Sequence, residues 1–505
     1  MEKIGENTLS GCAFIRSITL SDGLTEIGEK AFYNCRNLKN IVIPKTVTKI
    51  GSRAFANSGL KSIILPDGLT EIGERAFYNC RNLETLVIPK TVTKIGLCAF
   101  AYSILKSITL LDERLTEIGG SAFLECRNLE TIVIPETVTK IGRYAFAWSG
   151  LKSITLPDGI TEIGQWTFHG CKNLETVVIP NSVTKIGEYA FAESGLKSII
   201  LPDGLTEIGE STFYYCRNLE NITIPNSVTK INKYAFAESG LKSITLLDGQ
   251  LTEIGEGAFR ECHKLETIAI PNSVTKIGRY AIARSGLKSI ILPDGRLTEI
   301  EKGVFYKCYN LESVVIPKSV TKIGPYAFTE GKLKSIILPH GLTEIGESAF
   351  RECHNLESIV IPEVVINFAP YAFAESGLKS IILPNGLTEI GKFVFYGCRN
   401  LETVVISETV NKINPYAFAW SGLKSITLPH GLTEIEEGAF HYCGKLENVV
   451  IPKTVTKIGP LAFAEHVLKL TILPDGRLTE IGNHTSSRCG KLELKRKNQS
   501  RCILQ

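Results

Sequence analysis

The sequence predicts a repeat solenoid, in which short units stack to form a parallel β-sheet on a concave face, with short helical turns or irregular segments on the other. Three observations predict it. One phrase recurs in roughly 22 units of about 22 or 23 residues. No linker or change in composition interrupts the repeats over residues 1–490. Each unit contains one short stretch of alternating apolar and polar residues, which is typical of a half-buried strand.

Two versions of the phrase alternate along the chain. Residues 60–80 read "LKSIILPDGLTEIGERAFYNC", and residues 81–103 read "RNLETLVIPKTVTKIGLCAFAYS". Both follow the pattern L-x-x-[IV]-x-[IL]-P-x-x-[VL]-T-x-I-G-x-x-A-F-x-x-[CS]. Most insertions are single residues at one position of the phrase, as in "LLDERLTEI". An insertion tolerated at a fixed position indicates a turn between stacked units.

The first part of each unit is expected to form the strand. Leu60, Ile63 and Leu65 point inward, and Ile64 faces outward between them. Pro66 removes a backbone donor and fixes a turn. One unit alone cannot bury its apolar face, but stacked neighbours can.

The second part of each unit is expected to return along the back of the array. Ile72 is predicted to be buried, and the segment "ERAFYNC" is too short for a full helix. We expect one or two tight helical turns that place Ala76, Phe77 and Cys80 in the core. With parallel strands about 4.8 Å apart, the whole array would be a rod or shallow arc roughly 100 Å long.

The repeated phrase resembles the BspA-like, or Treponema pallidum type, leucine-rich repeat. The resemblance covers the chain from Glu2 to about Cys489. Members of that family are surface and adhesion proteins of bacteria and protists, and some bind host matrix proteins. The resemblance therefore implies a binding protein with an unidentified protein ligand. It does not name the ligand, because function resides on the variable outward positions.

Charge and hydropathy exclude several classes of protein. The net charge is +4 with both signs interspersed, so nucleic acid is not an expected partner. No apolar run reaches the roughly 18 residues of a membrane-spanning helix. The first 20 residues lack the pattern of a secretory signal, in contrast to secreted members of the family.

Twelve cysteines occupy one repeat position. Beyond Cys35 they recur at about 45 residues, or two units, so neighbours should lie about 9–10 Å apart. A disulfide requires α-carbons within about 7 Å, so pairing along the array is not expected. We interpret them as small buried hydrophobic side chains. They are Cys12, Cys35, Cys80, Cys126, Cys171, Cys216, Cys262, Cys308, Cys353, Cys398, Cys443 and Cys489.

Charged residues alternate in sign from unit to unit at two outward positions. One series runs Lys61, Glu84, Lys106, and the other runs Glu71, Lys94 in opposite phase. Such exposed pairs stabilise by roughly 0.2–1 kcal/mol each. We interpret them mainly as a device that penalises mis-stacking. A charged binding face or an end-to-end assembly code is the alternative.

A third outward position carries β-branched residues, with Thr at some units. The stripe is either a good sheet former or a protein-binding surface. The segment "IPEVVINFAPYAF" and the tryptophans depart from the repeat. Aromatic anchors are frequent in interfaces, although local repacking or drift in a redundant array is the favoured explanation. The candidate protein-binding residues are Ile64, Val87, Val133, Val178, Val364, Val365, Phe368, Trp148 and Trp420.

No catalytic motif is recognisable. The eight histidines fall at different repeat positions, and there is no H-E-x-x-H, no C-x-x-C pair and no phosphate-binding loop. The carboxylates belong to the alternating series. We therefore expect neither an active site, nor a metal or cofactor, nor a small-molecule substrate.

Residues 491–505 are expected to form a basic tail. Cys502-Ile503-Leu504-Gln505 fits a C-a-a-X prenylation motif, and nearby basic residues would bind an anionic cytoplasmic membrane surface. This combination predicts a lipid-anchored scaffold on the cytoplasmic side of a membrane. The alternatives are a cell-surface adhesin and a frayed tail with an accidental cysteine. The basic residues are Lys491, Lys495, Arg496, Lys497 and Arg501.

Overall fold

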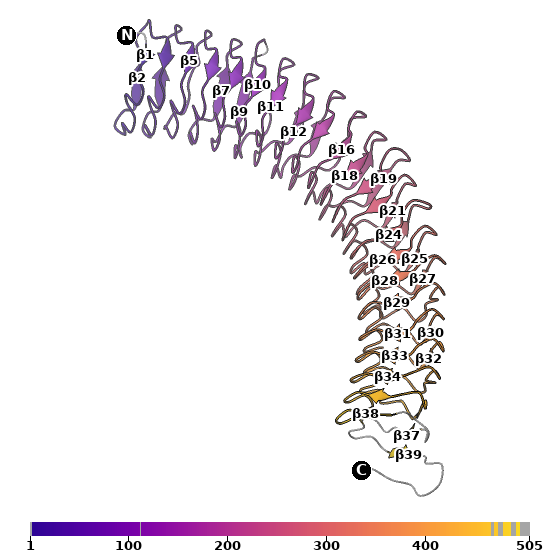
Figure 1. Ribbon diagram of the computed structural model, residues 1–505. Coiled ribbons are helices and arrows are strands. Elements are labelled where there is room, and N and C mark those ends of the chain that lie inside the picture. Colours follow the sequence, from indigo (N-terminus) through magenta and orange to yellow (C-terminus); the bar gives the residue numbers. More distant parts are fainter. Residues whose placement is uncertain (1–2, 112, 466–468, 473–477, 486–490, 495–505) are drawn as a thin grey trace. The chain divides into compact units, whose positions relative to one another are not determined.

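The computed structural model describes residues 3–111, 113–465, 469–472, 478–485 and 491–494. The chain divides into two compact units, Met1–Leu251 and Thr252–Gln505. Within each unit, successive rungs stack in chain order, and a rung contributes one or two short strands and a turn segment (Figure 1). All pairs of neighbouring strands are parallel, as the repeated phrase predicts.

The longer strands come from the first part of the repeated phrase. Their register pairs equivalent repeat positions, so that Ile222 lies opposite Ile244. In the first unit these strands are β2 (Ser17–Thr19), β4 (Asn40–Val42), β7 (Thr85–Ile88), β9 (Ser107–Leu110), β12 (Ser153–Thr155), β14 (Thr176–Val178), β17 (Asn221–Ile224) and β19 (Ser243–Leu246). In the second they are β21 (Thr267–Ala269), β23 (Ser289–Ile291), β25 (Ser313–Val315), β27 (Ser335–Ile337), β30 (Ser380–Ile382), β32 (Thr403–Val405), β35 (Asn448–Ile451), β37 (Lys469–Ile472) and β39 (Lys491–Leu494).

Two-residue strands form a second ladder, and in most of them a charged residue precedes a buried apolar one. In the first unit they are β1 (Lys3–Ile4), β3 (Glu26–Ile27), β5 (Lys49–Ile50), β6 (Glu71–Ile72), β8 (Lys94–Ile95), β10 (Glu117–Ile118), β11 (Lys140–Ile141), β13 (Glu162–Ile163), β15 (Lys185–Ile186), β16 (Glu207–Ile208) and β18 (Lys230–Ile231). In the second they are β20 (Glu253–Ile254), β22 (Lys276–Ile277), β24 (Glu299–Ile300), β26 (Lys322–Ile323), β28 (Glu344–Ile345), β29 (Asn367–Phe368), β31 (Glu389–Ile390), β33 (Lys412–Ile413), β34 (Glu434–Ile435), β36 (Lys457–Ile458) and β38 (Glu480–Ile481). The exceptions to the charged-then-buried order are Asn367 in β29, half-buried Ile4 in β1 and exposed Ile481 in β38.

The remaining segment of each rung is a run of turns, so the expectation of short helical turns is not supported. No residue that the structure describes is helical. Arg53 and Asn57 have φ angles of 53° and 58°, a left-handed conformation that a right-handed helix cannot contain. The Ala56 amide closes a turn onto the Arg53 carbonyl at 3.1 Å, whereas the Phe55 amide donates across to the Ala76 carbonyl of the next rung at 2.8 Å. Stacking therefore replaces the helical hydrogen bonds.

The core consists of aligned side chains from successive rungs. Leu60, Ile63, Leu65, Ile72 and the Ala-Phe pair at 76–77 are buried, as the repeat predicts. The phenylalanines stack face to face, with ring centroids 5.1–5.7 Å apart, over Phe32–Phe236 in the first unit and Phe305–Phe463 in the second. Ile282 occupies this position in one rung of the second unit. Stacked aromatic rings make this column the most regular part of the core.

Candidate protein-binding surface

The outward residue of the longer strands forms an apolar stripe in the second unit. We define the stripe as Ile291, Val315, Ile337, Val360, Ile382 and Val405, which belong to six successive rungs. All six are exposed, Val360 to 85%. Their neighbours in each strand point inward, because successive side chains of a strand face opposite sides.

Parallel pairing places the stripe residues side by side. Val315 lies opposite Ile337 in the β25–β27 pair, and Ile382 lies opposite Val405 in the β30–β32 pair. Rungs about 4.8 Å apart make the six residues a continuous band roughly 24 Å long. An exposed apolar band of this length marks a candidate interaction surface.

Polar residues border the stripe without giving it a net charge. On one side lies a column of hydroxyl residues, and beyond it run Lys–Glu pairs between neighbouring rungs. Four pairs flank the stripe: Lys288–Glu266 at 2.8 Å, Lys334–Glu312 at 2.9 Å, Lys379–Glu357 at 2.6 Å and Lys424–Glu402 at 2.7 Å. Because each charge is neutralised locally, the border offers no field to attract a charged ligand.

The first unit carries an interrupted version of the same stripe. Ile64, Val87, Val133 and Val178 are exposed, as predicted, and Ile64 is 85% exposed. Threonine separates several of them, as at Thr109. No run of apolar residues in the described part of this unit equals that of the second unit.

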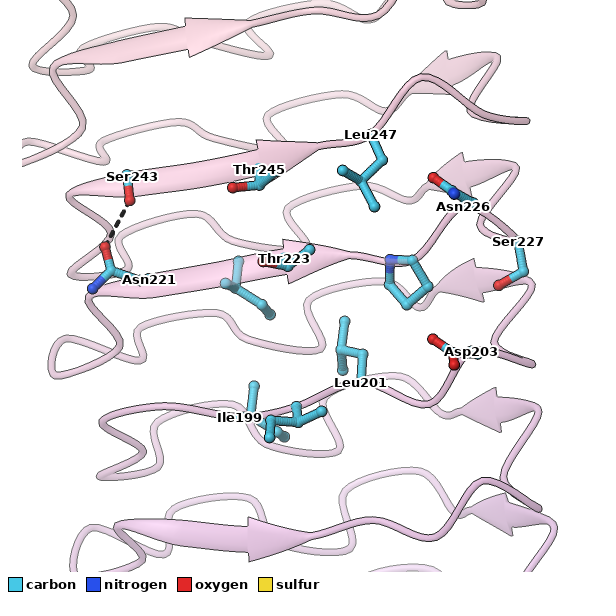
Figure 2. Close-up of a pocket in the computed structure, with 13 residues that line it drawn as sticks. Ile199, Leu201, Asp203, Asn221, Thr223, Asn226, Ser227, Ser243, Thr245 and Leu247 are labelled. Atoms are coloured by element: carbon cyan, nitrogen blue, oxygen red, sulfur yellow. Dashed lines mark hydrogen bonds between the residues drawn. The ribbon is translucent and has the colours of Figure 1, made fainter.

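A hollow of about 700 Å³ opens in the first unit where threonines replace the apolar residues (Figure 2). Its floor contains Thr223 and Thr245, and Asp203 and Asn226 lie at the turn side. Ser243 donates a hydrogen bond to Asn221 at 2.6 Å, which joins two rungs across the floor. The hollow is open, and its lining mixes apolar side chains such as Ile199, Leu201 and Leu247 with hydrogen-bonding ones, so it suits a ligand that has both kinds of surface.

The segment 361–373, which departs from the repeated phrase, lies partly in the core. The prediction that two of its residues bind a ligand is therefore wrong. Val365 and Phe368 are buried, and Phe368 packs edge-to-face on Phe373 with ring centroids 5.5 Å apart. They cannot contact a ligand, because they occupy inward repeat positions. Val364 remains at the surface, 46% exposed.

The tryptophans lie on the turn segments of their rungs. Trp148 packs edge-to-face on His169 with ring centroids 4.6 Å apart, and Trp166 contacts the same histidine. Burial lowers the pKa of His169, whose Nδ1 atom has no hydrogen-bond partner among the described residues. Trp420 is 42% exposed and stacks on Tyr442. Of these aromatic residues, Trp420 is the candidate that could contact a ligand.

The cysteine column is buried from Cys35 to Cys443, whereas Cys489 lies outside the described residues. The buried thiols make hydrogen bonds that the sequence did not reveal. Cys80 Sγ donates to the Phe55 carbonyl at 3.2 Å and lies 3.4 Å from Ser58 Oγ. Burial raises the pKa of Cys80 to about 11. The described cysteines are free, and Cys12 and Cys98 are only half-buried. Buried thiols with raised pKa values are unreactive, so the column is structural.

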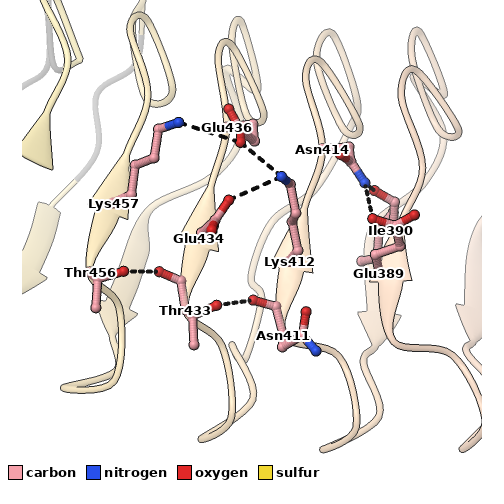
Figure 3. A network of polar contacts seen from close by, with 10 residues as sticks. All are labelled: Glu389, Ile390, Asn411, Lys412, Asn414, Thr433, Glu434, Glu436, Thr456 and Lys457. Carbon is pink, nitrogen blue, oxygen red and sulfur yellow. Dashed lines mark hydrogen bonds and ion pairs between the residues drawn. The ribbon is translucent and has the colours of Figure 1, made fainter.

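The second charge ladder is a network of ion pairs (Figure 3). Lys412 Nζ lies 3.0 Å from Glu434 and 3.1 Å from Glu436, and these hydrogen bonds raise the pKa of the lysine. Below it, the Thr433 hydroxyl donates to the Asn411 carbonyl at 2.9 Å. These contacts join neighbouring rungs and leave little charge free for binding.

A family model described as "BspA type Leucine rich repeat region (6 copies)" matches residues 2–126, 98–216, 184–308, 298–421 and 366–493. The chain belongs to this family. No curated protein matches it. The BspA-type repeat places the conserved apolar pattern in the core and the charges and the stripe outside.

Solved leucine-rich repeat structures of bacteria are similar to this BspA-type chain. A protein from Eubacterium ventriosum is 24% identical, covers 72% of this chain and 91% of that one, and has a TM-score of 0.41. One from Bacteroides ovatus is 26% identical over 92% of this chain and 91% of that one, with a TM-score of 0.29. A leucine-rich cell-surface protein from Faecalibacterium prausnitzii is 26% identical over 73% and 82%, with a TM-score of 0.31.

Within the described residues of this BspA-type chain, no helix is long and apolar enough to cross a membrane, and no group of three or more His, Cys, Asp or Glu residues could hold a metal ion. Lys491 begins β39. The other predicted membrane-binding residues and the predicted lipidation site, Cys502, lie outside the described residues.

Proposed function

We propose that this chain is a non-enzymatic scaffold that binds a protein ligand through the stripe. The observation that supports the proposal is the run of six exposed β-branched residues in successive rungs, two pairs of which are held side by side by parallel strands. Burying one such side chain contributes roughly 1.5–3 kcal/mol before the cost of association is subtracted. Six in a row therefore suffice for a specific complex.

The chemistry of the stripe defines the kind of protein that it fits. The ligand presents an apolar ridge, because the stripe itself has no charged member. The flanking Lys–Glu pairs are neutral together, so salt has little effect on the association rate. A ligand with a strongly basic or acidic surface is disfavoured.

A photo-crosslinking experiment in source cells tests the position of the surface. A benzophenone amino acid replaces Val360 in one version of the protein and Arg279, on a turn segment, in a control. The proposal predicts a discrete crosslinked protein from position 360 and none of the same mass from position 279. Equal adducts from both positions, or none from position 360, contradict it.

We further propose that the scaffold is tethered to the cytoplasmic face of a membrane. Where Gln505 is the last residue of the protein, Cys502 is the acceptor of a C-a-a-X prenylation motif. One lipid chain binds a membrane only marginally, and each nearby lysine or arginine adds about 1 kcal/mol on an anionic surface. The basic residues at 491–501 thus supply the second signal.

The mass of the C-terminal peptide from source cells tests the tether. The proposal predicts an isoprenoid on Cys502 and loss of the last three residues, and no modification in Cys502→Ser. An unmodified Cys502 in a cell that prenylates other proteins contradicts the tether. That outcome leaves the binding surface intact and favours the alternative of a cell-surface adhesin.

A further inference from the structure

A cavity of about 540 Å³ lies on the turn segments of the second unit, away from the stripe. Its lining includes Glu375, Tyr396, Gly397, Arg399 and Trp420. The cavity combines one aromatic wall with charged and hydrogen-bonding side chains. Such a combination is typical of small-ligand sites.

The cavity exists because one rung has a glycine at a repeat position where its neighbours carry larger side chains. Two residues after each core phenylalanine, successive rungs carry Glu352, Glu375, Gly397, Trp420 and Tyr442. All five have left-handed φ angles of 56–68°. Glycine fits this conformation without strain. The Glu375 side chain leans over Gly397, with its Cγ 2.8 Å from the position that a Cβ at residue 397 would take. The cavity borders both Gly397 and Trp420, whose rung lies about 10 Å from that of Glu375.

Trp420 presents one open face to the cavity. Its indole stacks on Tyr442 from the following rung, with centroids 4.1 Å apart and planes inclined by 15°. This contact covers one face and holds the ring in place. The opposite face borders the cavity toward the rung of Gly397. A fixed indole face packs well against the C–H groups of a saturated ring, because its π-system is electron-rich.

The absence of a side chain at Gly397 also leaves Arg399 without its usual hydrogen-bond acceptor. In other rungs the residue at the column position accepts a hydrogen bond from the arginine two residues later, as Asn79 does from Arg81 at 2.7 Å and Glu125 from Arg127 at 2.6 Å. Arg399 has only a glycine at that position. No hydrogen bond or ion pair of its guanidinium is found within the described residues. It is exposed at the cavity and able to bind a carboxylate through two parallel hydrogen bonds.

Glu375 is a hydrogen-bond acceptor at the cavity, and an ion pair holds its carboxylate in place. Arg351 Nη2 lies 3.3 Å from Glu375 Oε1 and 3.1 Å from Glu352 Oε1, so it orients the Glu375 carboxylate while sharing its charge with Glu352. Glu375 can therefore accept hydrogen bonds from hydroxyl groups, and the Asn400 amide can both donate and accept. A ligand with hydroxyl groups can both donate to and accept from these side chains, so it suits the cavity better than a bare cation does.

We propose that this cavity binds a carboxylated sugar, a hexuronate residue of a glycan. The pyranose ring packs on Trp420, its carboxylate pairs with Arg399, and its hydroxyls bond to Glu375 and Asn400. This site goes beyond the protein-binding stripe, and neither depends on the other.

Saturation-transfer NMR titrations of the full chain with D-glucuronate, D-glucose and choline test the site. The proposal predicts that glucuronate binds about tenfold more tightly than glucose, because a charge-assisted pair is added. Arg399→Ala should remove that tenfold preference and leave the weaker binding of glucose. Gly397→Glu fills the cavity with a side chain that the same repeat position already carries at Glu352 and Glu375. This variant should bind neither sugar. Arg217→Ala is the matched control, since Arg217 stands at the same repeat position but lies 3.8 Å from the Tyr215 ring.

Three outcomes would overturn the proposal. Glucuronate does not bind at millimolar concentration, or Gly397→Glu binds it unchanged, or choline binds and glucuronate does not. The last result would assign the indole and Glu375 to a cation. A circular-dichroism melt of each variant confirms that loss of binding does not arise from unfolding.

Discussion

Val315 and Ile337 are direct partners in a parallel strand pair, and both side chains face solvent. The same repeat positions elsewhere alternate between apolar residues and threonine. Stability alone does not require the run from Ile291 to Val405, because threonine serves equally well as a strand former in the first unit. The proposed recognition of a ligand would account for the unbroken apolar band in the second unit.

The cysteine column should be protected from alkylation. Burial raises the pKa of Cys126 to about 12, so at pH 8 only about one thiol in 10,000 is ionised. We expect iodoacetamide to label the half-buried Cys12 and Cys98 in the native protein, and Cys126 and its buried neighbours only after unfolding. Peptide mass spectrometry after a timed pulse measures this. Rapid labelling of Cys126 without denaturant would refute the packing described here.

The phenylalanine column should be sensitive to truncation. Phe328 stacks between Phe305 and Phe350, at 5.1 and 5.3 Å. Phe328→Ala should lower the free energy of unfolding by about 3–5 kcal/mol, because it leaves a cavity and removes two ring contacts. Urea denaturation measures the change. Ile282→Val, at the position where the column already lacks a ring, should cost only about 1 kcal/mol.

The left-handed turn positions should prefer glycine. Ser121 has a φ of 54°, and glycine occupies the same repeat position at Gly257 and Gly303. Ser121→Gly should raise the free energy of unfolding by about 1 kcal/mol, because the strain of an L-residue is relieved. Ser52→Gly, one residue before the strained position of its rung, should instead be destabilising by about 0.5–1 kcal/mol. If both variants shift the urea midpoint in the same direction, φ is not the cause.

The charge ladders should contribute a small, pH-dependent stability. Glu117 lies 3.0 Å from Lys94 and 3.2 Å from Lys140, and the hydrogen bond from Lys94 is the main cause of its lowered pKa. A depressed folded-state pKa stabilises above the unfolded value, and that stability is lost as the pH falls below about 4. Glu117→Gln should cost roughly 0.2–1 kcal/mol at pH 7, and less at 1 M salt.

Thermal melts of the wild type and Glu117→Gln at pH 7 and pH 3 check this expectation. The two proteins should differ at pH 7, and the difference should shrink as the pH is lowered to 3, because protonation of the wild-type carboxyl weakens its pairs with the lysines. An equal difference at both pH values would show that packing, and not charge, is the cause.

Regular features of the fold could be predicted from the sequence, because each is repeated many times. Burial of Ile72 and Phe77 and exposure of Ile64 follow from periodicity alone and are confirmed. The prediction of helical turns in the turn segments was wrong. Hydrogen bonds between rungs, such as that from Phe55 to Ala76, depend on stacking and leave no signal in the local sequence. Helical turns were the natural expectation for so short an apolar segment.

The candidate site was less predictable, because it depends on differences between rungs. Phe368 looked like an exposed aromatic anchor, but it occupies the repeat position of a core isoleucine and is buried. The cavity beside Gly397 was missed for the opposite reason, since a missing side chain is inconspicuous in a sequence with 44 glycines. Aligning the units and comparing each column would have revealed both.

The central claim is that the stripe binds the ligand, and matched variants test it most directly. One carries Ile337→Glu, Val360→Lys and Ile382→Glu, whose charges can pair between rungs. The control carries Ile64→Glu, Val87→Lys and Val133→Glu in the same column of the first unit. Quantitative mass spectrometry compares the proteins that each full-length bait and the wild type retain from source cells. The account predicts that at least one protein is retained by wild type and control and reduced at least tenfold by the stripe variant. Retention of every such protein by the stripe variant, with its melting temperature unchanged, would contradict the account.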